Sequence, residues 1–322
     1  MSEQYLELKN VRKYFQTPGG PLHAVDGVTF TLDKGHTIGV VGESGCGKST
    51  LGRVVSRLLD ATGGEIYFKG ENILNYKGRS LKALRREIQM IFQDPFSSLN
   101  PRKTIYNTIA EPTLTQRMYK TKSEVEYKVL EIMELVGIAE RYVNVYPHAL
   151  DGGRRQRVGI ARALALNPEL IVCDEPVSAL DVSIQAQILN LLKRLQQKFG
   201  YTYIFITHDL SVVKHFTQEV LVMYLGQMVE KAPVKTIFAN PRHPYTEALL
   251  SAIPSPDIDK VRDRVILKGE ITSPIRPKDE CRFADRCAYV CDTCRAKNPP
   301  LIDLGDGHLV RCYFPLKSKG NI

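Results

Sequence analysis

One stretch near the N-terminus limits the folds open to this chain more than any other. Residues 42–50 read Gly-Glu-Ser-Gly-Cys-Gly-Lys-Ser-Thr and satisfy the pattern G-x-x-x-x-G-K-[ST] at every fixed position. The preceding segment, 37–41, is apolar and β-branched, as in a buried strand. The following segment, 51–59, has a helical pattern. A strand, a glycine turn and a helix are the context in which this pattern binds phosphate.

The residue types in this stretch suit a polyphosphate. Successive N–H groups in a glycine turn point toward an anion, and the following helix adds the positive end of its dipole. Gly42, Gly45 and Gly47 allow a backbone path that a side chain would block. Lys48 is expected to reach the β- and γ-phosphates, and Ser49 to bind Mg²⁺. The alternative is a chance glycine turn between two core elements.

Length and composition are those of a globular protein with one large domain and an appendage, or with two domains. The 322 residues carry a net charge of +9, but the basic residues are scattered and form no nucleic-acid recognition motif, which favours a solvated or subunit-facing surface. Residues 1–5 lack the features of a signal peptide, and no apolar run is long enough to span a bilayer. We expect a cytoplasmic protein whose membrane role comes through partners.

Hydrophobic periodicity predicts two groups of strands. An antiparallel layer is expected from strands near 5–11, 24–32 and 63–70, with a loop at 17–21. A second group, in which each strand ends in polar residues, is expected at 88–95, 170–175 and 203–209. Because helical patterns separate the second group, we expect a parallel sheet with functional residues at the carboxyl ends of its strands.

Residues 104–166 are mostly helical in pattern. One helix is expected over 123–136, where apolar residues recur on one face, and Gly137 is a plausible terminator. Another begins after Asp151, whose side chain is a possible N-cap.

Three polar side chains at strand ends suggest the chemistry. Asp174 is placed to help hold Mg²⁺, and Glu175 to polarise an attacking water. His208, at the end of another strand, could contact the γ-phosphate. Alone, the two acids could be a surface pair and the histidine structural. Their combination with the phosphate loop favours ATP hydrolysis.

These motifs, in this order, closely resemble the ATP-binding subunit of an ABC transporter over residues 5 to about 250. The resemblance implies an α/β fold: a P-loop nucleotide-binding domain with a mixed sheet core, an antiparallel β layer and a helical subdomain at about 95–165. It identifies Gln93 as the residue that touches Mg²⁺ or the attacking water and senses the membrane subunits. Glu175 matches the catalytic base and His208 the switch histidine.

The resemblance also implies a full set of site residues. Catalysis is assigned to Glu175, His208, Lys48 and Gln93, and Mg²⁺ binding to Ser49, Gln93 and Asp174. Contacts with ATP are assigned to Phe15 (with Tyr14 as the adjacent candidate), Gly42, Ser44, Gly45, Cys46, Gly47, Lys48, Ser49, Thr50, Gln93, Asp151, Gly152, Gly153, Asp174 and Asp181.

The signature loop departs from the family pattern. The family has L-S-G-G-Q, whereas this chain has Leu-Asp-Gly-Gly-Arg at 150–154. In the family, the signature serine of one subunit donates to the γ-phosphate held by the other. An ionised Asp151 cannot donate, and at about 4 Å with an effective dielectric near 20 its repulsion is roughly 4 kcal/mol, which Arg154 or Arg155 could partly offset. We therefore hypothesise a heterodimer with a second ATPase; the alternative is that Asp151 is a tolerated N-cap.

The C-terminal part forms a second predicted unit, 251–322, after an ATPase domain at 1–250. The stretch His-Pro-Tyr-Thr at 243–246 resembles the extension of ATPases that serve oligopeptide, dipeptide and nickel importers. The cysteine spacing agrees with it, and some family members carry a [4Fe–4S] cluster on this pattern: Cys281, Cys287, Cys294 and Cys312. Zn²⁺ and free or redox thiols are the alternatives. Cys291 lies outside the spacing.

The sequence thus predicts the ATPase subunit of a peptide importer at the cytoplasmic face of the cell membrane. Its expected partners are a second ATPase, two transmembrane permease subunits and, indirectly, an external peptide-binding protein, with no nucleic acid. The alternatives are a soluble ABC-type ATPase acting on nucleic acid or ribosomes, an ATP-binding regulatory subunit, and nickel as the substrate.

Overall fold

The computed structural model describes residues 5–253, 265–267, 269 and 272–318. Residues 1–4, on which the prediction of no signal peptide partly rests, lie outside the described residues, as do residues 254–264 of the predicted extension.

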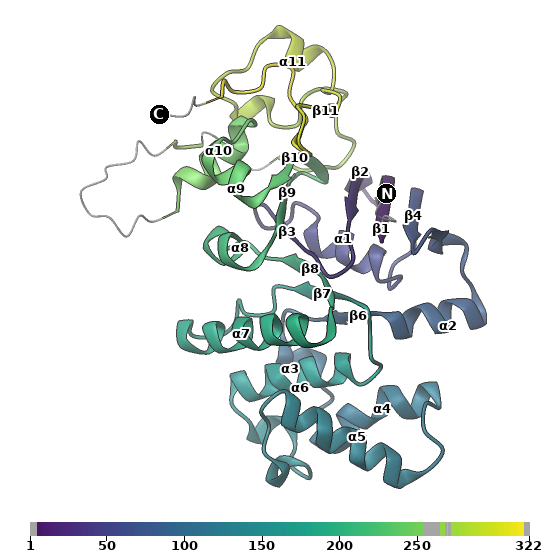
Figure 1. The fold of residues 1–322 in the computed structure, drawn as a ribbon. Helices are drawn as coiled ribbons and strands as arrows, with labels where there is room; N and C mark the ends of the chain where they lie inside the picture. The colour runs from purple at the N-terminus through teal and green to yellow at the C-terminus, as the bar shows by residue number, and fades with distance from the viewer. Residues whose placement is uncertain (1–4, 254–264, 268, 270–271, 319–322) are drawn as a thin grey trace.

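A mixed sheet runs through the middle of the described part of the chain (Figure 1). Its strand order is β11-β12-β10-β9-β3-β8-β7-β6. The parallel strands are β9 (Glu219–Tyr224), β3 (Thr37–Val41), β8 (Thr202–Ile206), β7 (Leu170–Asp174) and β6 (Ile88–Ile91). Every residue of β3, β7 and β8 is buried, because both faces of a parallel sheet are covered. The predicted parallel sheet is confirmed.

The three strands predicted to end in polar residues are shorter than expected. β6, β7 and β8 stop at Ile91, Asp174 and Ile206, so that Gln93 and Glu175, like His208, lie in the loops that follow. A loop frees these polar side chains from the buried faces of the sheet. They remain at the carboxyl edge of three neighbouring strands.

The period of two along β7 and β8 separates two cores. Ile171 and Tyr203 face the cluster that contains α7 (Val182–Phe199). Val172 and Ile204 face the cluster that contains α1 (Lys48–Val55) and the antiparallel layer. The helix predicted at 51–59 therefore starts earlier and ends earlier, since its first turn is part of the phosphate loop.

The antiparallel layer has the order β2-β1-β4-β5. Its strands are β1 (Leu6–Thr17), β2 (Gly20–Leu32), β4 (Gly63–Phe68) and β5 (Glu71–Asn72). The loop predicted at 17–21 is wrong in length, because β1 and β2 are joined by only two residues. Gly20 makes this possible with a φ of 113°.

The helical part lies below the sheet in Figure 1 and includes α3 (Pro95–Ser98), α4 (Ile105–Gln116), α5 (Lys122–Leu135) and α6 (Gly152–Leu164). α2 (Gly78–Glu87) lies beside β6. The predicted helix at 123–136 corresponds to α5, which starts with a capping box between Thr121 and Glu124. Gly137 follows its end with a φ of 74°. These local signals therefore gave the right element.

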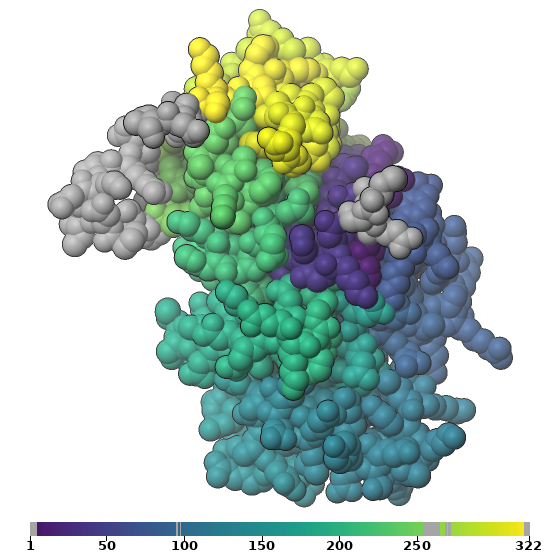
Figure 2. All heavy atoms as spheres, viewed as in Figure 1, coloured from purple at the N-terminus to yellow at the C-terminus, as the bar shows by residue number. Residues whose placement is uncertain are grey.

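The C-terminal part lies at the opposite end of the molecule from the helical part (Figure 2). The predicted unit 251–322 contributes α11 (Asp292–Ala296), β11 (Ile302–Asp303) and β12 (Leu309–Val310) to it. These elements pack on the preceding β10 (Gln227–Pro233), α9 (Val234–Ala239) and α10 (Pro244–Ser251), while α8 (Leu210–Phe216) lies between β8 and β9 in the chain. β12 pairs with β10 and so extends the main sheet. Among the described residues, no helix combines the length and apolar character needed to cross a membrane.

A buried carboxylate fastens this part to the sheet. Glu230 on β10 accepts hydrogen bonds from the backbone N–H groups of Arg242 and His243, at 2.7 and 2.9 Å. Its Oε1 lies 2.7 Å from Nε2 of His308, next to β12. A buried charge needs such partners, so these contacts fix the start of α10, through Arg242 and His243, and the docking of the extension, through His308.

His243 gives stability a pH dependence. Its Nδ1 accepts the backbone N–H of Tyr245 at 3.1 Å and caps α10, and burial lowers the pKa of His243 to about 4. The unfolded pKa is about 6.5, so the neutral ring stabilises the fold fully above that pH and the contribution is lost as the pH falls toward 4.

We predict that wild type loses about 2 kcal/mol more free energy of unfolding than His243→Asn between about pH 7.5 and about pH 5. Asparagine keeps a cap acceptor but does not titrate. Urea unfolding at each pH measures the difference. Equal losses in the two proteins would contradict the assignment.

Candidate functional site

The phosphate loop connects β3 to α1 along a path that requires glycine. Gly42 and Gly47 have φ values of 148° and 103°. A Cβ at Gly42 would lie 2.2 Å from the carbonyl oxygen of Met223, and one at Gly47 would lie 2.0 Å from that of Ala24. Backbone cannot yield to such contacts, so no other residue fits. Gly45 also has a positive φ but faces open space.

Lys48 is the buried cation of the loop. The residue is only 5% exposed. Its Nζ donates to the carbonyl oxygens of Gly42 and Glu43, at 2.8 and 3.0 Å. The Cys46 Sγ lies 3.9 Å from the same Nζ, and burial raises the pKa of the Cys46 thiol. The loop therefore holds its amine in place with its own carbonyls. Ser44, by contrast, is exposed.

Ser49 and Asp174 link the loop to the end of β7. The Ser49 Oγ donates to Oδ1 of Asp174 at 2.7 Å, and Asp174 is 2% exposed. Burial raises the pKa of Asp174, while the Ser49 hydrogen bond and the nearby Arg53 oppose the rise. One hydroxyl and one carboxylate beside a phosphate loop are oxygen ligands of the kind that Mg²⁺ prefers. Thr50 follows, half-buried.

Glu175 is the meeting point of the strand-end residues. Its Oε2 accepts a hydrogen bond from Nε2 of Gln93 at 3.0 Å and lies 3.3 Å from Nδ1 of His208. The three side chains come from the loops after β6, β7 and β8. Glu175 has a φ of 45°, which turns the chain out of the strand. A carboxylate held by an amide and an imidazole is suited to accept a proton from water.

The signature residues form a separate group on the helical part. Asp151 caps α6 by accepting the backbone N–H of Arg154 at 2.7 Å, and its carboxylate also pairs with the Arg154 guanidinium. Gly153 packs near Ile184, whose N–H is accepted by Asp181 at 3.0 Å to cap α7. That backbone hydrogen bond lowers the pKa of Asp181. Among the described residues, no hydrogen bond or ion pair joins Asp151, Gly152, Gly153 or Arg154 to the phosphate loop.

The two aromatic candidates for adenine stacking have different surroundings. The Tyr14 ring is stacked on His23, with centroids 3.9 Å apart, and its hydroxyl donates to Asp26 at 2.5 Å. Phe15 is half-buried, with the Nζ of Lys13 5.0 Å from its ring centroid. Tyr14 already has an aromatic partner, so Phe15 remains the predicted contact.

The four cysteines of the predicted cluster line one cavity of about 20 Å³, room for one water molecule. Burial raises the pKa of Cys281 to about 12 and that of Cys312 to about 11. Within the part of the chain that the structure describes, no three His, Cys, Asp or Glu side chains are grouped to hold a metal ion. The described residues therefore contain no preformed site for the predicted iron–sulfur cluster or for Zn²⁺, although all four cysteines line the same cavity.

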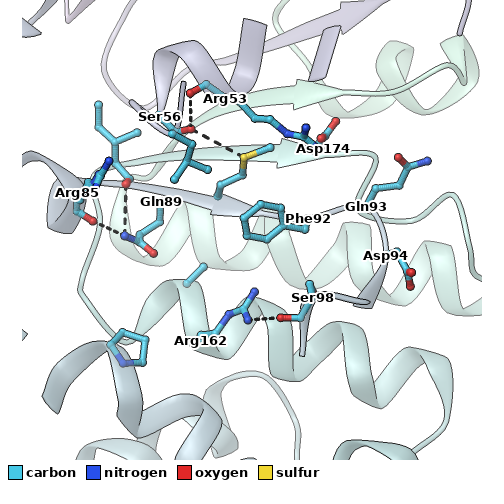
Figure 3. Close-up of a pocket in the computed structure, with 15 residues that line it drawn as sticks. Arg53, Ser56, Arg85, Gln89, Phe92, Gln93, Asp94, Ser98, Arg162 and Asp174 are labelled. Atoms are coloured by element: carbon cyan, nitrogen blue, oxygen red, sulfur yellow. Dashed lines mark hydrogen bonds between the residues drawn. The ribbon is translucent and has the colours of Figure 1, made fainter. Parts of the chain in front are cut away.

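A groove beside the site was missed by sequence reasoning. It encloses about 610 Å³ between α1, β6 and the helical part, and its lining includes Gln93 and Asp174 (Figure 3). Arg162 also lines the groove, and its guanidinium donates to the carbonyl oxygen of Ser98 at 2.5 Å. In Figure 3, Phe92 lies between Asp174 and Arg162. In the sequence, the groove is indicated only by the polar residues Gln93 and Asp94 that follow β6.

The chain is similar to known ATP-binding subunits of transporters. The ABC transporter family matches residues 25–178, and the family "Oligopeptide/dipeptide transporter, C-terminal region" matches residues 229–294. The oligopeptide transport ATP-binding protein AppF of Bacillus subtilis is 50% identical, covering 97% of this chain and 98% of its own length. The dipeptide transport ATP-binding protein DppF of Escherichia coli is 47% identical, covering 96% and 93%.

A solved structure is also similar. The dimeric ATP-binding cassette MJ0796, in a post-hydrolysis state with ADP and Pi bound, has a TM-score of 0.66 and 31% identity. The match covers 71% of this chain and 98% of that one. The chain therefore belongs to the ABC transporter family, in the oligopeptide/dipeptide group of its ATP-binding subunits, and is an ABC-type ATPase.

Proposed function

We propose that this ATPase powers the import of oligopeptides or dipeptides across the cytoplasmic membrane, bound to the cytoplasmic face through permease subunits. The observation that carries the proposal is similarity along the whole chain, including the C-terminal region, to ATP-binding proteins of oligopeptide and dipeptide transport. The membrane-spanning path is then supplied by the permeases, and the peptide is delivered by an external binding protein.

The site residues divide the reaction among themselves. Lys48 exchanges its two carbonyl partners for oxygens of the β- and γ-phosphates. Ser49, Asp174 and Gln93 would hold Mg²⁺, and the ion would supply positive charge beside the phosphates. Glu175 takes a proton from the water whose oxygen attacks the γ-phosphorus, and the bond from that phosphorus to the bridging oxygen of ADP breaks. His208 contacts the γ-phosphate, and Phe15 stacks on the adenine.

The altered signature favours a heterodimer. The similar cassette MJ0796 is dimeric with ADP and Pi bound. In our proposal the nucleotide lies between two such subunits, so that Asp151 faces the phosphates held by its partner. Its pairing with Arg154 offsets part of the repulsion, but both side chains are exposed, and screening weakens that compensation. A homodimer would carry the substitution at both sites. Pairing with an ATPase that has the usual serine leaves one site intact, the one formed by this chain's phosphate loop.

The groove beside Gln93 suits the permease. It lies between the sheet and the helical part, and a movement transmitted there would reach Gln93 and Glu175 directly. Phe96, at the start of the helical part, is exposed and has the Arg155 guanidinium 4.0 Å from its ring centroid. An amphipathic segment on the cytoplasmic side of a permease is the occupant that we propose.

We also propose that Cys281, Cys287, Cys294 and Cys312 hold a [4Fe–4S] cluster. Four thiols on one apolar cavity are the donor set of such a cluster. Because these thiols do not form a metal-binding group in the described structure, the cavity that they line must change shape to take a cluster. The predicted division at residue 250 is likewise a proposal, with the cysteine unit as the smaller domain.

The transport proposal predicts that vesicles carrying both permeases, this chain and a second ATPase take up labelled peptide when ATP is supplied on the cytoplasmic side. With this chain as the only ATPase, uptake and turnover should be at least about tenfold slower, because both sites carry Asp151. Asp151→Ser should restore much of the loss in that arrangement.

Asp60→Ser is the matched control, since Asp60 is also an exposed acid paired with an arginine, Arg57, at 3.2 Å. Rapid uptake with this chain alone would contradict the heterodimer. Absence of peptide uptake in the complete assembly, with ATP hydrolysed, would contradict peptide transport.

The cluster proposal predicts a brown protein when the chain is purified without oxygen, with about four iron atoms and four acid-labile sulfides per chain. Cys281→Ser should lose the visible absorption, whereas Cys291→Ser should keep it, since Cys291 is outside the ligand set. A colourless wild type with zinc, or loss of colour only in Cys291→Ser, would contradict the assignment.

A further inference from the structure

The extension makes direct contact with the phosphate loop. Arg286, one residue before Cys287, forms a two-pronged ion pair with Glu43: its Nη1 lies 2.6 Å from Oε2 and its Nη2 3.1 Å from Oε1. The Arg286 side chain is 8% exposed and that of Glu43 is 26% exposed. The Tyr245 hydroxyl also accepts the backbone N–H of Glu43 at 2.9 Å. One loop residue is thus held at both its side chain and its main chain.

Glu43 in turn touches the catalytic lysine. Its carbonyl oxygen accepts a hydrogen bond from Nζ of Lys48 at 3.0 Å. The chain of contacts from the extension to the phosphate-binding amine therefore has one intermediate residue. The side chain of Glu43 also places a negative charge in the loop that is proposed to receive a polyanion.

A second arginine of the extension contacts the strand that follows the aromatic pair Tyr14 and Phe15. Arg282, one residue after Cys281, pairs with Asp26 and donates to the carbonyl oxygen of Leu225. Asp26 is the acid that accepts from Tyr14. Tyr14, the neighbour of the predicted adenine contact Phe15, is therefore linked through Asp26 to the same turn of the extension that contacts the phosphate loop.

The turn between the two arginines is tightly packed. Its backbone closes on itself through N–H groups of Ala284 and Arg286, which donate to the carbonyls of Cys281 and Phe283 at 2.9 and 3.0 Å. Phe283 is buried, with its ring 5.3 and 5.4 Å from those of Tyr224 and Tyr245. The arginines consequently project from one fixed unit.

We propose that Arg286 is a positioning residue for nucleotide binding. It neutralises Glu43 and holds the phosphate loop in the shape that accepts the triphosphate, with Arg282 supporting the adenine end. The C-terminal extension is then part of the nucleotide site. This rests on the proposed function only in requiring that the loop bind ATP. A guanidinium fits the role because its fork matches a carboxylate, whereas an ammonium cannot make both contacts.

Loss of Arg286 leaves a partly buried carboxylate unneutralised beside the phosphates, so ATP should bind more weakly while the bound complex reacts normally. For Arg286→Gln in the full-length chain, we expect the Kd for MgATP and the KM to rise roughly 5- to 100-fold with kcat little changed. Arg286→Lys should lie in between. Glu43→Gln combined with Arg286→Gln should recover most of the affinity, since it removes the uncompensated charge.

Arg295→Gln is the matched control, because Arg295 belongs to the same extension but pairs with the exposed Asp285, at 2.9 Å. It should bind ATP like wild type. Calorimetric titration with MgATP, and thermal melting of every variant, give the readouts. If Arg286→Gln misfolds, the ATP affinities of the double variant and of Arg286→Lys test the positioning role instead.

The outcomes separate this inference from the proposed function. Wild-type affinity in Arg286→Gln, or a double variant no tighter than a poorly binding single variant, overturns the positioning role alone. Failure of the wild-type chain to bind MgATP overturns the nucleotide function itself.

Discussion

Lys48 is a cation buried within the loop that must receive a polyanion, and the rest of the site depends on how its charge is satisfied. A buried ammonium group is costly unless it is partnered, and here the carbonyls of Gly42 and Glu43 supply the partners. Those two oxygens can face inward because Gly42 and Gly47 take backbone angles that other residues avoid. Phosphate oxygens would be stronger partners for the amine. When a nucleotide binds, Nζ of Lys48 can therefore exchange its two carbonyl partners for phosphate oxygens.

The parallel sheet brings the remaining chemistry to this amine. Neighbouring strands end at the same edge. The loops after β6 and β8 therefore place Nε2 of Gln93 and Nδ1 of His208 at 3.0 and 3.3 Å from one carboxylate oxygen of Glu175, which lies in the loop after β7. Ser49 and Asp174 are joined across the same edge. The groove in Figure 3 opens beside these residues, which gives a partner on the helical side a short route to the reacting groups.

Features specified by neighbouring residues could be predicted from the sequence. The glycine turn, the Asp151 cap and the buried strands are of this kind, and the structure has each of them. The Glu43–Arg286 pair could not be predicted, because its members lie 243 residues apart and nothing beside either one specifies the other. The groove was missed for the same reason. The cysteine spacing named a possible ligand set, but spacing alone could not show that the thiols would close on a cavity the size of one water.

The most direct test compares MgATP binding and phosphate release in wild type, Glu175→Gln and Lys48→Ala. We expect Glu175→Gln to bind ATP at least as tightly as wild type but to release phosphate at least about 100-fold more slowly, because only the proton acceptor is lost. We expect Lys48→Ala to lose most ATP binding. Unchanged ATP affinity in Lys48→Ala, or normal phosphate release by Glu175→Gln, would contradict the roles assigned to these two residues.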